Sequence, residues 1–142
     1  MHEPFDLSDF LPYLLNQAAD ASSLEFQGYY RSRYAMLRTE WRVLFHLGRY
    51  GPMTARAVCD RARIHKTKVS RAVAALEAKR FVRRRTLEHD RRQEELALTP
   101  SGEAAFRDLA AAAQRFDREL LQGFTAEEEA TLRRCLARIA GL

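Results

Sequence analysis

Residues 65–92 constrain the fold most, because a helical and an alternating apolar pattern follow one another there. The first apolar residues recur at spacings of four and three, which marks one stripe of a helix: Val69, Val73 and Leu76. After residue 80 the pattern shifts toward alternation, in residues 81–87 and again in 94–98, with a polar tip between them. Two such runs predict a β-hairpin.

The exposed side of this unit is rich in hydrogen-bond donors. Five candidate DNA-contacting residues fall largely off the apolar stripe of the helix: Lys66, Thr67, Lys68, Ser70 and Arg71. Because strand residues alternate, at most two of the three arginines 83–85 are expected to face one ligand. A helix fits the major groove of DNA, and a basic hairpin tip reaches phosphates or the minor groove. The pattern therefore indicates a recognition helix beside a basic hairpin.

Positive charge is concentrated in the same part of the chain. Residues 56–92 contain thirteen Lys and Arg against four Asp and Glu, a net charge of +9. The remainder has eleven basic and fifteen acidic residues, a net charge of −4, and the two parts agree with the total of +5. A basic centre between acidic flanks is typical of a module that binds a polyanion.

Helices are predicted before this segment. The first begins with Ser8 or Asp9 as its N-cap, has Pro12 in its first turn and runs to about Tyr30. A second helix, capped by Thr39, ends at Gly51-Pro52. A short third helix spans about 55–62 with Thr54 as its cap, and 63–65 form a turn before the cationic helix. Two helices joined by a three-residue turn predict a helix-turn-helix.

Two helices are also predicted after the hairpin. Thr99 or Ser101 caps a long helix over about 101–122, and Thr125 with Glu128 forms a capping box for the last one. The first and last helices have more apolar surface than a winged helix of about sixty residues covers, so we expect pairing with a second copy. A symmetric dimer would present two recognition helices about 34 Å apart, one turn of B-DNA.

These motifs resemble the MarR family of bacterial winged-helix regulators. The resemblance rests on 37–54, 64–84 and above all 90–106, which contain Asp90-Arg91-Arg92 and Leu98-Thr99-Pro100-Ser101-Gly102. It implies a mainly α fold with a small β-hairpin wing, and a triangular homodimer. It divides the chain into an N-terminal dimerisation helix (1–36), a DNA-binding domain (37–99) and C-terminal dimerisation helices (100–142).

The resemblance also assigns roles to residues. Arg92 would enter the minor groove while Asp90 holds the wing tip, and Arg91 and Arg84 join the expected DNA contacts. Thr67, Lys68, Ser70 and Arg71 would lie in the major groove. Two departures from the family pattern occur. Arg80 stands where members usually have Gly at the end of the recognition helix, so that end is expected to be shaped differently. Val58-Cys59 replaces a common Leu-Ala pair.

A small-molecule effector is a further expectation, because relatives often bind phenolic or other aromatic anions. The candidate pocket residues are Tyr30, Tyr34, Arg38, Trp41, Phe45 and His46. Core packing is the commoner role for such aromatic residues, and a structural role the commoner one for such a histidine.

Other chemistry finds little support. No Ser-His-acid or Cys-His arrangement, phosphate loop or catalytic carboxylate pair is evident, so no enzyme and no cofactor is expected. The four histidines (His2, His46, His65 and His89) lack metal-ligand spacing. Cys59 and Cys135 are expected to be small buried residues, and without a cysteine near the first helix, oxidant sensing is not expected. No export signal or membrane span is evident, which favours the cytoplasm.

The sequence therefore predicts a homodimeric transcription regulator of double-stranded DNA. Its leading form is a repressor that binds a palindromic operator near a regulated operon and is released by a small effector. A ligand-independent architectural DNA-binding module is the alternative. An RNA-binding role is a third possibility, but the chain lacks the exposed aromatic platform that such binding uses.

Overall fold

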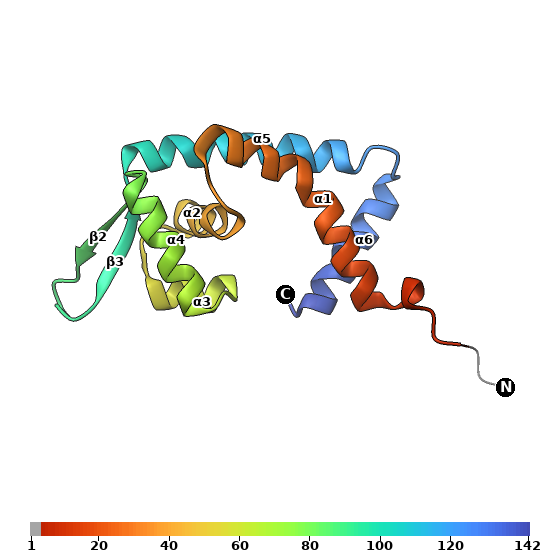
Figure 1. Cartoon of the computed structure of the whole chain (residues 1–142), viewed down its shortest axis with the longest axis horizontal. Coiled ribbons are helices and arrows are strands. Elements are labelled where there is room, and N and C mark those ends of the chain that lie inside the picture. The colour runs from red at the N-terminus through yellow and green to blue at the C-terminus, as the bar shows by residue number, and fades with distance from the viewer. Residues whose placement is uncertain (1–3) are drawn as a thin grey trace.

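The computed structural model describes residues 4–142, and the dimerisation helix proposed for 1–36 begins outside that range. The elements, in chain order, are a 3-10 helix (Leu7–Asp9), α1 (Leu11–Tyr34), α2 (Arg38–Tyr50), β1 (Met53–Thr54), α3 (Ala55–Ala62), α4 (Lys66–Ala78), β2 (Val82–Thr86), β3 (Glu94–Leu98), α5 (Pro100–Leu120) and α6 (Ala126–Ala140). Helices α2, α3 and α4 and the hairpin form one lobe, and α5 runs from this lobe to an arm made of α1 and α6 (Figure 1). This confirms the expected mainly helical fold with a β-hairpin wing.

Helix α2 lies at the centre of the lobe. Its buried face (Val43, Leu44 and Leu47) joins one apolar cluster with the buried stripe of α4 and with Leu96 of β3 and Leu109 of α5. The buried residues of α4 are those that the helical spacing predicts: Val69, Val73 and Leu76, together with Ala72. Burial of this stripe therefore fixes which side of α4 faces outward.

The helix-turn-helix and the wing have the predicted boundaries closely. Thr54, Thr99 and Thr125 each accept a backbone N–H at the start of α3, α5 and α6. Strands β2 and β3 pair antiparallel, with Val82 opposite Leu98 and Thr86 opposite Glu94. The two-residue strand β1 pairs with β3 and was not predicted, because two residues carry no periodic signal.

The first helix differs from the prediction at both ends. Asp6, rather than Ser8 or Asp9, is a cap: its carboxylate accepts the Ser8 N–H and closes the 3-10 turn. Helix α1 then begins after Phe10 and continues past Tyr30 to Tyr34. Tyr30 is buried and the Tyr34 hydroxyl bonds to α5, so tertiary packing extends the helix beyond the weak signal of Gly28.

The cap predicted for the second helix is also wrong. Helix α2 starts at Arg38, so Thr39 lies inside its first turn. Glu40 performs the capping instead: one carboxylate oxygen accepts the Leu37 N–H at 2.8 Å, and the other accepts from Lys79 Nζ at 2.8 Å. Glu40 is buried, and this pair ties the start of α2 to the end of α4.

The base of the wing is joined to the end of α4 through Thr99. The Thr99 N–H donates to the Phe81 carbonyl at 3.0 Å, and its hydroxyl donates to the Arg80 carbonyl at 2.6 Å. Gly102 sits against the same strand: a Cβ there would lie 2.0 Å from the Phe81 oxygen. Only glycine allows this approach, which gives the Thr99-Pro100-Ser101-Gly102 motif a structural reason.

Arg80 adopts the left-handed conformation that glycine would favour, with φ = 62°. The Phe81 N–H donates to the Leu76 carbonyl and the Arg80 N–H to the Glu77 carbonyl, both at 2.9 Å, which completes a Schellman motif. The expectation of a differently shaped helix end is therefore wrong. The hydrogen bonds at the helix end and the Thr99 contact hold the backbone in place despite the larger residue.

Arg80→Gly should raise the free energy of unfolding by about 1 kcal/mol, because glycine removes the strain of a left-handed non-glycine residue. Urea denaturation at a fixed protein concentration would measure this. Arg80→Ala is the matched control, since it removes the exposed side chain but keeps the strain. Equal midpoints for the two variants would contradict the explanation.

Candidate nucleic-acid interface

The outward face of α4 carries the five residues predicted to contact DNA. All five are exposed, whereas the intervening Val69 and Ala72 are buried. The imidazole Nδ1 of His65 accepts the Thr67 N–H at 3.2 Å and caps the helix. Sequence reasoning missed this role because histidine is not among the usual N-cap residues. The cap fixes the start of α4, where Lys66, Thr67 and Lys68 are presented.

The wing tip is closed by Asp90. Its carboxylate accepts the Arg92 N–H at 3.0 Å, and its carbonyl accepts the Gln93 N–H at 3.1 Å. The Gln93 carbonyl in turn accepts the Leu87 N–H at 3.1 Å. These bonds engage the backbone of the tip, and the side chains of Arg91 and Arg92 remain exposed.

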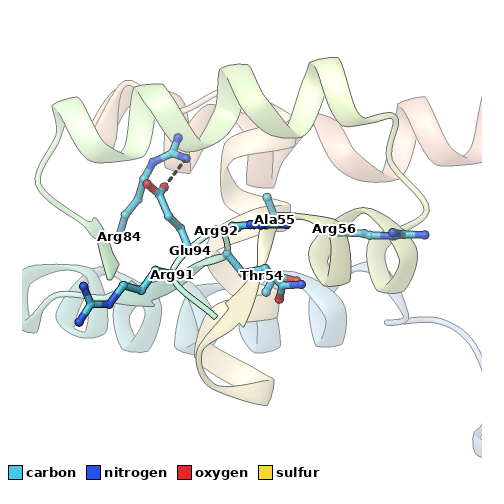
Figure 2. A pocket seen from close by; sticks show the side chains of 8 residues that line it. Thr54, Ala55, Arg56, Arg84, Arg91, Arg92 and Glu94 are labelled. Carbon is cyan, nitrogen blue, oxygen red and sulfur yellow. Dashed lines mark hydrogen bonds and ion pairs between the residues drawn. The ribbon is translucent and has the colours of Figure 1, made fainter. Parts of the chain in front are cut away.

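A hollow of about 410 Å³ lies between the wing and the start of α3, and we call it the wing-side hollow. Figure 2 shows the side chains that line it, which include four arginines: Arg56, Arg84, Arg91 and Arg92. Glu94 is the one carboxylate in its lining. Sequence reasoning did not single out Arg56, because it lies on α3, well separated in sequence from the wing.

Arg84 is the most constrained of these arginines. Its Nε donates to Glu77 of α4 at 2.9 Å and its Nη1 to Glu94 at 3.3 Å, as the dashed line in Figure 2 marks for the latter. The hydrogen bond to Glu77 raises the pKa of Arg84, so the group stays charged. Two carboxylates offset much of that charge and orient the guanidinium toward α4 and the hollow. Direct DNA contact by Arg84 remains a prediction.

Its two neighbours lie on the other face of β2, as alternation requires. Arg85 is paired with Glu95, whereas Arg83 is exposed and has no carboxylate within 4 Å in residues 4–142. Arg83 is therefore the arginine of this run whose charge is most available to a polyanion.

The residues proposed for an effector pocket do not converge on one point. Tyr30, Trp41 and Phe45 stack in one aromatic cluster, with ring centroids 6.0 Å apart for Tyr30 and Trp41 and 4.9 Å for Trp41 and Phe45. Arg38 instead lines a separate hollow near the start of α4. This packing is what core aromatic residues show, and the effector pocket stays a prediction.

Tyr34 and His46 are each held elsewhere. The Tyr34 hydroxyl donates to Asp108 of α5 at 2.5 Å, and burial together with this bond raises the pKa of Tyr34 to about 12. His46 Nδ1 lies 2.7 Å from the Arg42 carbonyl, a satisfied contact within its own helix, and its ring is next to Tyr50. Both polar groups already have a protein partner.

The remaining predicted features fall outside the interface. Cys59 is half-buried, but Cys135 is exposed, so the expectation of two buried cysteines is wrong for Cys135. Within residues 4–142 there is no group of three His, Cys, Asp or Glu side chains placed to hold a metal, and His2 lies outside the described residues. No helix in that range combines the length and apolarity that a membrane crossing requires.

A three-helix lobe with an exposed cationic α4 and an arginine-tipped hairpin defines a winged helix-turn-helix DNA-binding protein. The sequence model of the MarR family matches residues 36–93, which cover α2 to the wing tip. Together with the whole-chain structural similarity given below, this match shows that the chain belongs to the MarR family of transcriptional regulators.

Two relatives are uncharacterized HTH-type transcriptional regulators of Bacillus subtilis (strain 168). YwoH is 28% identical over 68% of this chain and 69% of its own length. YwaE is 28% identical over 77% of this chain, which spans 64% of that protein. The family and these relatives are regulators rather than enzymes.

Solved structures share the fold along nearly the whole chain. Bordetella bronchiseptica BpsR, whose DNA binding is described as regulated by 6-hydroxynicotinic acid, has a TM-score of 0.89 at 20% identity and 99% coverage of both chains. PcaV of Streptomyces coelicolor, solved with its natural ligand, has a TM-score of 0.83 at 20% identity, covering 99% of this chain and 98% of that one. At such identities the similarity establishes the fold alone.

Asp90→Ala should weaken duplex binding several-fold, because the tip loses the acceptor for the Arg92 N–H. Asp90→Asn keeps an acceptor oxygen and should bind at least as well as the original protein. Fluorescence anisotropy with a labelled duplex would measure both. The sign is diagnostic: if charge alone mattered, removal of an acid would strengthen binding by both variants.

Proposed function

We propose that two copies of this chain form a homodimer that binds a palindromic operator and represses a nearby operon in the cytoplasm. The observation that carries the proposal is the joint exposure of the donor face of α4 and the Asp90-closed wing on one lobe. In this proposal α4 enters the major groove, while Arg91 and Arg92 reach the adjacent minor groove. The domain division into 1–36, 37–99 and 100–142 is part of the same proposal.

The arm supports the dimer. Helix α6 has no buried residue, and the apolar side chains of Leu132, Leu136 and Ile139 are exposed by 40–58%. Leu11 and Leu24 of α1 are exposed by 61% and 64%. Water contact with so much apolar surface is unfavourable by roughly 25 cal/mol per Å², so a second copy that covers these faces would be stabilised. A two-fold dimer also presents two α4 helices to the two halves of a palindrome.

Arg92→Ala should lower the affinity for an operator duplex more than tenfold, since a guanidinium in the minor groove would be lost. Electrophoretic mobility shift or anisotropy titrations would measure the change. Size-exclusion chromatography and thermal melting should give the values of the original protein. Near-original affinity would remove the wing tip from the proposed mechanism.

Leu136→Glu should convert the dimer into a monomer and abolish tight binding of a palindrome, because it introduces a charge into the proposed apolar interface. Leu37→Glu is the matched control: it places the same charge on an exposed leucine of the DNA-binding lobe. Analytical ultracentrifugation should find monomer for the first variant and dimer for the second. A dimeric Leu136→Glu variant would exclude this face of α6 as the interface.

A comparison of palindromic and scrambled duplexes in a salt titration tests sequence-specific regulation. A regulator should bind the palindrome far more tightly, whereas an architectural module would bind both equally. Transcription from the adjacent promoter, with and without the gene, then decides repression.

The effector proposal is supported by the two structural relatives above whose titles mention a ligand. It predicts that a small aromatic acid raises the melting temperature and weakens operator binding. A ligand shifts the protein between two states only if it binds one of them more tightly.

A further inference from the structure

A second basic hollow, of about 320 Å³, opens beside the start of α2, and we call it the α2-side hollow. Its lining comes from the first turn of α2, the turn before α4, and α4 itself. Four lining residues carry a lasting positive charge: Arg38, Arg42, Arg63 and Lys68. Thr39, Ile64 and His65 complete the lining, and none of the seven is acidic.

These four cations lack counter-ions. None of them has a carboxylate within 4 Å among residues 4–142, in contrast to Arg84 and Arg85 of the wing. Burial and the nearby charge of Arg38 lower the pKa of Arg42, which shows that like charges are held together. A concave cluster of one sign with no internal partner attracts an ion of the opposite sign.

Two of the guanidinium groups are held in place by helix ends. Arg42 Nη2 donates to the Ala62 carbonyl at 2.8 Å, and Arg63 Nη1 donates to the Ala140 carbonyl at 2.6 Å. These carbonyls belong to the last residues of α3 and α6, where the helix dipole is negative. Each guanidinium has five N–H donors, so most remain available to an oxyanion.

The two hollows lie at opposite ends of α3. The wing-side hollow includes Ala55 and Arg56 at the start of this helix, and the α2-side hollow includes Arg63 directly after its end. Eight helical residues span about 12 Å. The major groove of B-DNA is about 12 Å wide and is bordered by a phosphate backbone on each side.

We infer that the α2-side hollow binds an oxyanion of the phosphate type, and that in the DNA complex this is a backbone phosphate on the edge of the major groove away from the wing. The inference rests on the proposed binding of duplex DNA. Arg38 and Thr39 would then anchor the lobe from α2, which the sequence did not identify as a DNA-contacting element.

Arg38→Gln tests the site, because no hydrogen bond or ion pair of the Arg38 side chain is present in residues 4–142. The slope of log Kd against log salt concentration should fall by about 0.9, equally for palindromic and scrambled duplexes. Arg107→Gln, which removes an exposed arginine of α5, is the matched control and should leave the slope unchanged. Thermal melting without DNA checks that both variants are folded.

A second arm replaces the duplex with inorganic phosphate. The original protein should be stabilised by phosphate in thermal melting, and Arg38→Gln should lose much of that shift. A reduced salt slope supports the DNA phosphate as the source. An unchanged slope with a lost phosphate shift overturns that source and assigns the hollow to a free oxyanion. No change in either measurement refutes the site. Failure of the original protein to bind any duplex refutes the proposed function, while the phosphate arm still tests the hollow.

Discussion

The packing of the apolar stripe of α4 against α2 is the interaction on which the rest of the lobe depends. Val69, Val73 and Leu76 are almost fully buried against a cluster that includes Leu44 and Leu47. Because a helix has one continuous surface, burial of this stripe leaves the intervening polar residues facing solvent. The cationic face is thus a direct consequence of core packing, and its orientation is as rigid as the core beneath it.

Polar contacts then fix where the ends of α4 lie. His65 caps its start, and the buried Glu40 accepts hydrogen bonds from both Lys79 and the Leu37 backbone near its end. Loss of one partner from a buried pair is strongly unfavourable, typically by about 3–5 kcal/mol, so this contact holds α4 in register with α2. The left-handed Arg80 and the Thr99 hydrogen bonds then lead directly into the wing. Reading helix and wing therefore move as one body.

Charge is distributed unevenly within that body. On the wing, Glu77, Glu94 and Glu95 pair with Arg84 and Arg85, which orients those side chains and reduces their net field. Around α2 and the α3–α4 turn, Arg38, Arg42 and Arg63 have no such partners in the described residues. A count of basic residues treats all these arginines alike, whereas the arrangement separates those that support the fold from those free to meet a polyanion.

The sequence by itself determined the elements whose signals are local. The periods of α4 and the hairpin, the threonine caps at 54, 99 and 125, and the Asp90 turn all appear as predicted, because each depends on residues within a few positions of one another. Only the tertiary structure decided the rest: the extension of α1 to Tyr34 by its bond to Asp108, the capping of α2 by Glu40, and the separation of Arg38 and His46 from the aromatic cluster. These features arise from contacts between residues far apart along the chain, and such contacts leave no periodic trace in the sequence.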